Sequence, residues 1–430
     1  MDDTSASRSI ADMARNERPN LYGASLVLLT PALIGSLANV ASALFMLFAL
    51  RRPERITSLV RAPGTARILA AAFAIFFIAE AVAALVNWHG LPSAREIGEN
   101  LVFLGFLPFL SLFEARPKTI LRGLVMFAPA MAVAAFATAM FQLMFLGFRP
   151  QGGAGNPAVF AVTVSVIYAV CIAGFHSQSP GQRRMSLGGA LLAAATILLS
   201  GTRGMWPAIM ILPVLYFWII GRAGRRTGQE IARPVLAGGL AALLIVLTVI
   251  YFIPGGPASR VTEGLKDWQL IQQGDFDSSL GKRYAMWAGG TRAALQRPLF
   301  GHGPDMPGEI MRNETARYFE KGLAYSHFHN FMLNEMIRAG IAGTLAMLAM
   351  MGALLWGWNK PPLSSTGLTG QFLLASLFAN YMLSGLFNLA FDHDILDFMF
   401  VTGSATFCYL AFGPDVNTSS VRGSASGGAS

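Results

Sequence analysis

Repeated apolar runs constrain this chain more than any other feature of its sequence. A transmembrane α-helix needs about 20 consecutive, mostly apolar residues, and such runs recur along the whole chain. They lie at roughly 66–88, 99–114, 119–146, 157–175, 185–200, 204–220, 234–253, 329–356, 368–391 and 394–412. Only 13% of the 430 residues are charged, about half the share found in soluble domains. We therefore expect an all-α integral membrane protein.

The first apolar run, residues 21–50, has two interpretations. It is long for one membrane helix and short for two. Pro31 and the pair Gly35-Ser36 lie near its middle and suit a tight reversal. We favour two short helices, which gives about twelve spans with both termini on one side; a single helix gives eleven. The polar residues 1–20 lead straight into this run without a cleavage pattern, so no cleavable signal peptide is expected.

Basic residues are divided unequally between the loops. Lys and Arg accumulate in cytoplasmic loops of membrane proteins. Here they fall together in alternate loops, at Arg51, Arg52, Arg55, Arg61, Arg67, Arg116, Lys118, Arg122, Arg183, Arg184, Arg222, Arg225, Arg226, Arg233 and Lys360. The intervening short loops hold the single arginines Arg95, Arg149 and Arg203. Five of the six histidines also lie on that side, at His89, His302, His327, His329 and His393. This pattern places the intervening loops outside, and it explains the net charge of +9 without a nucleic-acid partner.

One outer loop, residues 254–328, is much longer than the others. It opens with the helix-breaking stretch Pro254-Gly-Gly-Pro257 and then shows two helical patterns. The first pattern has an apolar face that we expect to lie on the membrane, formed by Leu280, Tyr284, Trp287 and Leu295. The second covers Gly308–Lys321, with Gly322 as its C-cap.

These boundaries divide the chain into four parts. They are transmembrane helices over 1–253, the outer loop over 254–328, further transmembrane helices over 329–412, and a flexible tail over 413–430.

The outer loop ends in Tyr325-Ser-His327-Phe-His329-Asn330, and an apolar span follows. A neutral imidazole accepts a proton near physiological pH, so His327 and His329 are candidate bases. Metal binding by the two histidines is the alternative. The first turns of the span also carry Asn334, Glu335 and Arg338. Polarity inside a span is costly and typical of functional segments. Pairing of Arg338 with either neighbour would give it a structural role.

Two isolated arginines are candidates for binding an anion. Arg203 lies in the tight turn Ser200-Gly-Thr-Arg203-Gly between two apolar helices, and Arg283 precedes Trp287 by one helical turn. A guanidinium stays charged, and its paired N–H donors match phosphate oxygens. Both could instead be ordinary interfacial residues. The Gly-rich stretch from Arg149 to Asn156 could cradle phosphate through its backbone or form a flexible hairpin.

Taken in order, these motifs resemble those of the O-antigen ligase and polymerase family of bacterial inner-membrane glycosyltransferases. The matching parts are Gly152…Asn156-Pro157, Ser200-Gly-Thr-Arg203-Gly, Arg283-x-x-x-Trp287, Pro298-Leu-Phe-Gly301-His302-Gly303, His327-Phe-His329-Asn330 and Glu335-x-x-x-x-Gly340-x-x-Gly343. The resemblance implies a GT-C-like protein of twelve spans in the inner membrane of a Gram-negative bacterium, with its active site facing the periplasm.

The resemblance also implies a reaction. Polysaccharide is transferred from undecaprenyl pyrophosphate to the lipid A–core oligosaccharide, with inversion of the anomeric centre and without a metal or other cofactor, to complete lipopolysaccharide. Chain polymerases and protein O-oligosaccharyltransferases share the motifs, and the compact chain with its modest outer loop favours the ligase. A transporter or flippase of an anionic lipid-linked cargo is the alternative from another class; such proteins often contain internal repeats, and no repeat is evident here.

Position by position, Arg203 and Arg283 match the pyrophosphate-binding arginines of the family, and His329 matches its candidate catalytic base. We expect these three to be catalytic. We also expect contacts with the pyrophosphate or the acceptor from His327, Asn330, Arg149, Asn156, Trp287, His302 and Arg338. The role of His327 stays open between a second base, an acceptor contact and a support for His329.

Overall fold

The computed structural model describes residues 23–61, 64–177, 179–227, 257–359 and 364–417. Within these ranges all regular elements are helices, which confirms the predicted helical class. Six of the described helices are long and apolar enough to cross a membrane. They are α5 (Thr65–Val86), α8 (Pro117–Phe145), α11 (Trp206–Thr227), α16 (Phe331–Ala353), α17 (Ser365–Phe387) and α18 (Asp394–Asn417). Twelve spans remain a prediction, because the expected run 234–253 lies outside the described residues.

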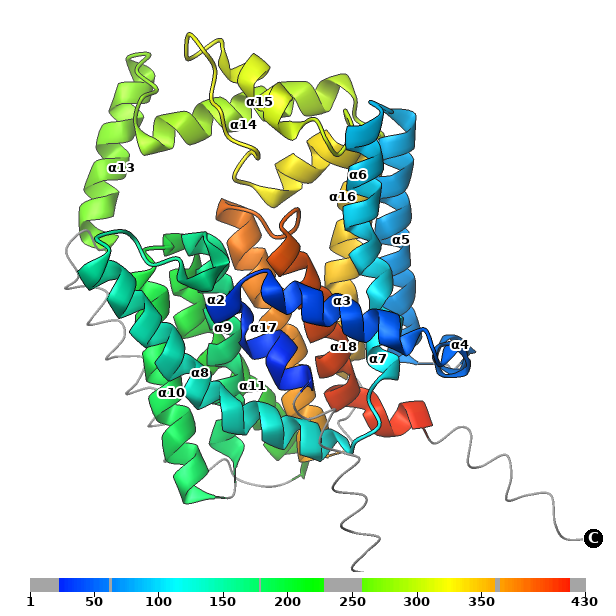
Figure 1. Cartoon of the computed structure of the whole chain (residues 1–430). Coiled ribbons are helices and arrows are strands. Elements are labelled where there is room, and N and C mark those ends of the chain that lie inside the picture. The colour runs from blue at the N-terminus through cyan, green and yellow to red at the C-terminus, as the bar shows by residue number, and fades with distance from the viewer. Residues whose placement is uncertain (1–22, 62–63, 178, 228–256, 360–363, 418–430) are drawn as a thin grey trace, which may run out of the picture.

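Helix α9 (Pro157–Ala173) forms the centre of one half of the bundle. Every residue from Val159 to Ala173 is buried, as expected for a helix that is apolar all round. It packs against α8, α11, α17 and α10 (Pro180–Leu199). Figure 1 shows α8, α9, α10 and α11 grouped on one side and α5, α16 and α18 on the other. The first residues of α9 therefore hold a fixed position at one end of the bundle.

The first apolar run is not one continuous helix, since two helical pieces meet at Gly35; that the run crosses the membrane twice stays a prediction. Helix α2 (Pro31–Ile34) ends there, at φ 56°, and α3 (Leu37–Ala49) begins two residues later. Figure 1 shows α3 running across the bundle at a steep angle to α5. A Cβ at Gly35 would lie 2.2 Å from the carbonyl oxygen of Gly153. The Gly-rich stretch therefore allows two backbones to touch, so close packing explains its glycines.

The predicted span 99–114 begins earlier than expected. Helix α6 (Leu91–Asn100) runs directly into the 3₁₀-helix η1 (Leu101–Gly105) and α7 (Phe106–Ser111). Arg95, expected in a short outer loop, lies instead on α6, where it pairs with Glu99 one turn later. Residues four apart are neighbours on a helix, so the pair of Arg95 with Glu99 stabilises a helix here. The prediction of a loop at Arg95 was therefore wrong.

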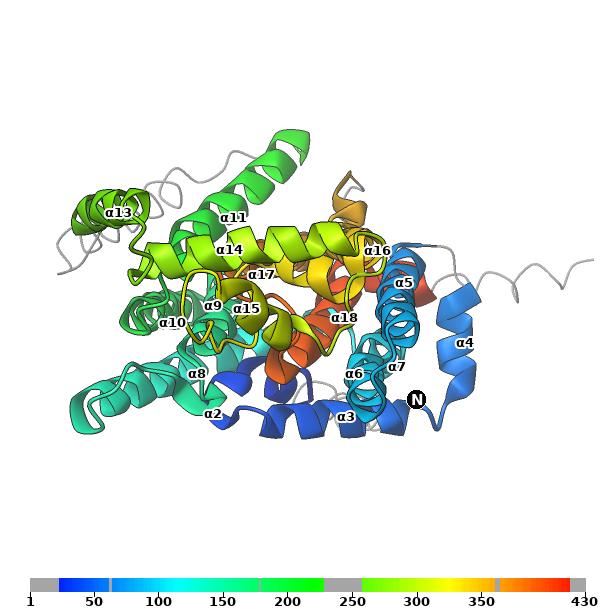
Figure 2. The same ribbon diagram turned by 90° about the horizontal axis from the view of Figure 1, so that it is seen from above.

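The long loop folds into three helices at one end of the bundle, which we call the outer end. They are α13 (Pro257–Gln272), α14 (Ser279–Gln296) and α15 (Pro307–Thr315). Figure 2, seen from above, shows α14 lying across the bundle between α13 and α16. The sequence patterns missed α13 and extended the last helix to Lys321. It ends earlier because the chain turns back, and Leu323 N donates to Thr315 Oγ1 at 2.7 Å.

The prediction of one outward-facing apolar face on α14 is only partly correct. Leu295 is exposed, but Trp287 points the other way and donates from Nε1 to Phe328 O at 3.0 Å. Trp287 packs against a small second core that includes Met286, Met311 and Phe328. The long loop therefore has a core of its own that fixes the backbone next to the two histidines.

Helix α16 is interrupted at Gly340, which has φ 66° and ψ −158°. A break in a membrane helix leaves backbone N–H and C=O groups without helical partners, and each must find another. The stretch Pro298–Gly303 supplies them. His302 N donates to Ile337 O at 2.7 Å and Gly303 N to Arg338 O at 3.1 Å on one side of the break.

On the other side of the break the direction of donation is reversed. Ile341 N donates to Pro298 O at 2.8 Å, and Ala342 N donates to Leu299 O at 3.3 Å. The Pro-Leu-Phe-Gly-His-Gly motif thus completes both ends of the interrupted helix. It also ties the loop between α14 and α15 to the membrane-spanning part of the protein.

Gly340→Ala is expected to destabilise the protein, because its Cβ would lie 2.5 Å from the Leu299 carbonyl group and because the left-handed conformation costs a side chain about 1–2 kcal/mol. The melting temperature of the purified protein should fall by on the order of 5 °C. Gly352→Ala, in the same helix with nothing within 4 Å of its new Cβ, is the matched control. Equal melting temperatures for the two variants would contradict this account.

Candidate active site

A cavity of about 700 Å³ lies at the outer end of the bundle. Its walls come from the loop before α9, the turn before α11, the start of α14, the segment before α16 and the end of α17. The polar side chains that line it belong to Arg149, Asn156, Thr202, Arg203, Ser279, Arg283, His327, His329, Ser384 and Asn388. None of the lining residues is acidic. All three residues expected to be catalytic therefore share one positively charged cavity.

Arg203 and Arg149 are brought together by the turn between α10 and α11. Gly201 adopts φ 64°, and Arg203 then begins the 3₁₀-helix η4 (Arg203–Met205). Arg149 donates to Ser200 O and to Thr202 Oγ1, the latter at 3.1 Å. Burial and the charge of Arg203 lower the pKa of Arg149. The mutual repulsion of these guanidinium groups would be relieved by a bound anion.

Arg283 reaches the cavity from the second turn of α14. Ser278 caps this helix and accepts from Gly281 N at 3.0 Å, which fixes where the helix begins. Burial lowers the pKa of Arg283, although a guanidinium remains charged at any physiological pH. The outer loop therefore adds a third guanidinium to the two contributed by the bundle.

His327 and His329 meet over the amide of Asn388. Their ring nitrogens, His327 Nε2 and His329 Nδ1, are 3.1 Å apart, and Asn388 Oδ1 lies 3.0 and 3.1 Å from them respectively. His329 has a φ of 49°. This left-handed conformation is uncommon for a residue with a side chain, and such strain concentrates at functional sites. The backbone is thus bent to turn both imidazoles towards one acceptor.

This arrangement selects one tautomer of each histidine. Asn388 Oδ1 can only accept, so His329 donates from Nδ1 and His327 donates from Nε2. Neutral His329 then keeps its lone pair on Nε2. Neutral His327 keeps its lone pair on Nδ1, which accepts from the Ser326 hydroxyl at 3.0 Å. His329 is consequently the imidazole with a basic nitrogen still available in the cavity.

Both histidines are held in the neutral form. Burial, together with the neighbouring His329, lowers the pKa of His327 to about 4. Burial and the charge of Arg283 lower the pKa of His329. Asn388 opposes both shifts, but burial prevails. At neutral pH both rings are therefore uncharged, and His329 Nε2 is the nitrogen left available to accept a proton in the cavity.

Several residues expected to contact substrate have structural partners instead. Asn156 lines the cavity but caps α9, where its Oδ1 accepts from Ala158 N at 2.8 Å. Asn330 caps α16 by accepting from Leu333 N at 3.0 Å. His302 Nε2 contacts Ala293 O at 2.8 Å. Asn330, His302 and Trp287 are not among the residues lining the cavity. Those three side chains therefore lie outside the cavity surface, whereas Asn156 forms part of it.

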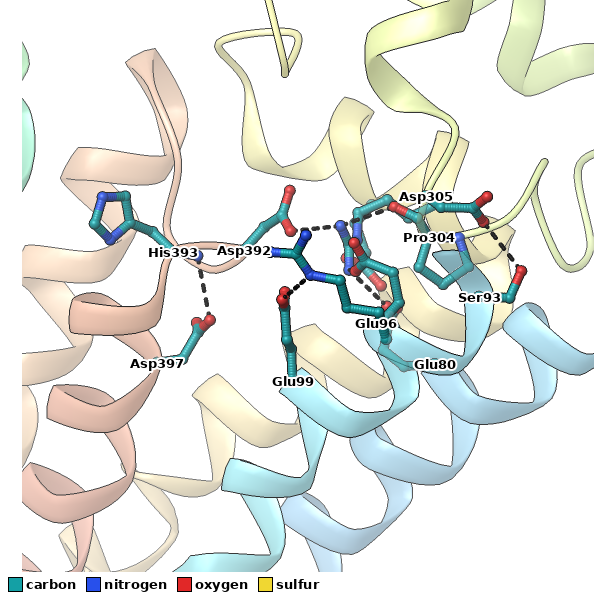
Figure 3. A network of polar contacts seen from close by, with 12 residues as sticks. Glu80, Ser93, Glu96, Glu99, Pro304, Asp305, Asp392, His393 and Asp397 are labelled. Carbon is teal, nitrogen blue, oxygen red and sulfur yellow. Dashed lines mark hydrogen bonds and ion pairs between the residues drawn. The ribbon is translucent and has the colours of Figure 1, made fainter. Parts of the chain in front are cut away.

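Arg338, also expected to contact substrate, does not line the cavity and is buried among carboxylates. Figure 3 shows three of these carboxylates, Glu80, Glu96 and Asp392, on different segments of the chain. It lies 3.2 Å from Glu80 on α5, 3.1 Å from Glu96 on α6 and 2.6 Å from Asp392, while Glu335 lies 4.0 Å away. The sequence suggested only pairing within its own helix, since the partners on α5, α6 and the loop before α18 are remote in the chain. Arg338 therefore joins four parts of the fold.

Asn388 was not singled out in the sequence, because it is a single polar residue at the end of an apolar run. Asp392 belongs to the outer-side pattern Asp392-His-Asp394, which is common by chance and assigned it no role. The structure shows that they belong to one short segment between α17 and α18, with Asn388 at the histidines and Asp392 at Arg338. The ion-pair network thus anchors the segment that orients the histidines.

The metal-binding alternative for the histidines has no support from a third ligand. Among the residues described, no three His, Cys, Asp or Glu side chains are grouped so that they could hold a metal ion.

Arg338→Met should cost about 3–5 kcal/mol of stability, because it leaves buried carboxylates without their counter-ion. The loss should be smaller at pH 5 than at pH 8, since protonation removes the uncompensated charge. Arg292→Met is the control: Arg292 pairs with Glu314 but keeps 34% of its side chain exposed, so its loss should cost about 1 kcal/mol or less. Thermal unfolding of the purified variants at both pH values tests this prediction. Equal losses of stability in the Arg338 and Arg292 variants would contradict the role given to Arg338.

Comparison with known proteins agrees with the resemblance seen in the motifs. Residues 188–348 match the model of a protein family described as O-Antigen ligase. An uncharacterized protein of Haemophilus influenzae is 25% identical over 295 residues, which cover 65% of this chain and 69% of that protein. The family match includes Arg203, Arg283, His327 and His329, while Arg149 and Asn388 lie outside it.

Proposed function

We propose, on the basis of the match between residues 188–348 and the O-antigen ligase family model, that this membrane enzyme transfers a polysaccharide from undecaprenyl pyrophosphate to lipid A–core oligosaccharide. We place the reaction at the periplasmic face of the bacterial inner membrane. One observation carries the proposal: three guanidinium groups and two neutral imidazoles line a single cavity that has no acidic side chain. Such a cavity suits a pyrophosphate and a hydroxyl that must lose its proton.

The arginines would hold the donor and stabilise its departure. When the bond between the sugar and the pyrophosphate breaks, negative charge develops on the leaving phosphate oxygens. Arg203 and Arg283 face the same cavity from different parts of the fold, so they can bind that group from two sides. In many enzymes, fixed donors aimed at developing charge contribute more to the rate than any other effect. Arg149, held by Ser200 and Thr202, adds a third positive charge.

His329 would act as the general base. Its Nε2 takes the proton of the acceptor hydroxyl while the hydroxyl oxygen attacks the anomeric carbon. The bond from that carbon to the pyrophosphate oxygen breaks, and its electrons leave with undecaprenyl pyrophosphate. Attack from the face opposite the leaving group inverts the anomeric centre. Because both substrates are lipid-anchored in one leaflet, orientation within the cavity supplies a large part of the rate.

Arg203→Ala, Arg283→Ala and His329→Ala should each lower transfer of lipid-linked glycan to lipid A–core by on the order of 10²–10³-fold, the usual cost of removing one charge-stabilising donor or a base. The assay uses purified protein of confirmed thermal stability. Arg317→Ala, which removes an exposed arginine from the same outer loop, should retain full activity. Full activity of the His329 variant, including after treatment with EDTA, would remove it as the base.

Asn388→Asp should move the acidic limb of the pH–rate profile upward by on the order of one pH unit. A carboxylate beside His329 Nδ1 favours the imidazolium, so it raises the pKa of His329 and less free base remains at pH 6.5. The wild-type protein should stay active below pH 6.5, because the pKa of His329 is lowered by burial. Asn388→Ala should lose activity without the upward shift. An unchanged limb in the Asp variant would mean that His329 does not take the proton.

A further inference from the structure

A second polar cavity, of about 660 Å³, lies at the end of the bundle opposite the active-site cavity. Helix α17 connects the two: Ser365 and Thr366 at its start line the second cavity, and Ser384 and Asn388 at its end line the first. A helix of 23 residues spans about 35 Å at 1.5 Å per residue. The second cavity is therefore remote from the proposed chemistry and needs an explanation of its own.

Two unpaired basic side chains line this cavity. Lys118 and Arg122 are one turn apart on α8, so they project from the same face. Both are exposed, and neither has an ion-pair partner among the residues described. Arg52 and Arg55, by contrast, both contact Glu114. The cavity thus carries two positive charges that no acidic side chain within the described ranges compensates.

A hydroxyl at the cavity wall and two helix starts add groups that can bind an anion. Thr366 is only 8% exposed, lines the cavity, and its hydroxyl has no hydrogen-bond partner within the described part of the chain. Helices α10 and α17 both begin at the cavity, capped by Ser179 and Ser364 respectively. Helix N-termini carry partial positive charge and bind phosphate groups. These independent features all favour a bound anion.

The position of the cavity indicates that the anion is part of an amphiphile. Helix α8 is long and apolar enough to cross the membrane, and Lys118 and Arg122 lie in its first two turns. Met126, one turn further along α8, lines the same cavity with 51% of its surface exposed. Positive charge thus lies at the start of the span, and exposed apolar surface follows it towards the hydrocarbon.

We propose that this cavity binds the phosphate headgroup of an anionic phospholipid, with one acyl chain lying along α8. Lys118 and Arg122 would bind the phosphate, and Thr366 would donate its hydroxyl hydrogen to a phosphate oxygen. Basic pockets between transmembrane helices are known to hold such headgroups. The proposal does not depend on the reaction assigned to the other cavity.

Native mass spectrometry of the full-length protein, titrated with dioleoyl phosphatidylglycerol, tests this site. The double variant Lys118→Gln/Arg122→Gln should bind the lipid roughly thirtyfold more weakly, since each basic residue near a membrane surface contributes about a fivefold preference for anionic lipid. Thr366→Val should weaken binding by a smaller factor without any change in net charge. Dioleoyl phosphatidylcholine should not replace the phosphatidylglycerol in the wild-type protein.

Arg183→Gln/Arg184→Gln is the matched control. It removes the same net charge from the first turn of α10, at the same end of the bundle, and neither arginine lines the cavity. Its lipid binding should equal that of the wild type. Equal weakening in both double variants would overturn the site in favour of general surface attraction. Displacement of the lipid by millimolar inorganic phosphate would overturn the lipid in favour of free phosphate. Melting temperatures confirm that all variants are folded.

Discussion

The interruption of α16 at Gly340 is the constraint on which the outer half of this protein depends. Backbone groups exposed by a break inside a membrane cannot turn to water, so another segment has to supply their partners. Pro298–Gly303 does so from both sides of the break. This contact fixes the loop that follows α14, and with it the helix that carries Arg283. The site is thus positioned by main-chain hydrogen bonds as much as by its own side chains.

Charged side chains gather at two places in the fold. Carboxylates outnumber basic groups at one, and only basic groups are present at the other. At Arg338 one guanidinium serves several buried carboxylates, and this cluster joins α5, α6, α16 and the segment before α18. In the active-site cavity three guanidinium groups stand without any acidic neighbour in the lining. Removing the one cation from a buried group of carboxylates is strongly destabilising, whereas positive charge that lines a cavity suits an anionic ligand. Arginine therefore has a structural role at Arg338, and the proposed function gives it a binding role in the cavity.

The sequence was most informative where chemistry and local pattern coincide. Arg203 in its glycine-flanked turn, Arg283 on an amphipathic helix and the His-x-His segment all carry local signals, and they do line one cavity. Asn388 carried no such signal, because its role follows from the packing of α17 beside the His-x-His segment. The glycines near residue 153 suggested a phosphate cradle, yet they accommodate the backbone of α2. The predicted direction of the Trp287 side chain was wrong for a similar reason. The side chain packs against the small core beneath α14, and this core cannot be inferred from the sequence of α14 alone.

The central claim is that the cavity transfers glycan from a pyrophosphate donor to lipid A–core. Incubation of the purified protein with undecaprenyl pyrophosphate-linked glycan and lipid A–core, with separation of the products on a gel and identification by mass spectrometry, tests it most directly. The account predicts a ladder of glycan on lipid A–core together with released undecaprenyl pyrophosphate. Lengthening of the lipid-linked chain alone would identify a polymerase instead, and unchanged substrates from folded protein would contradict the proposed transfer.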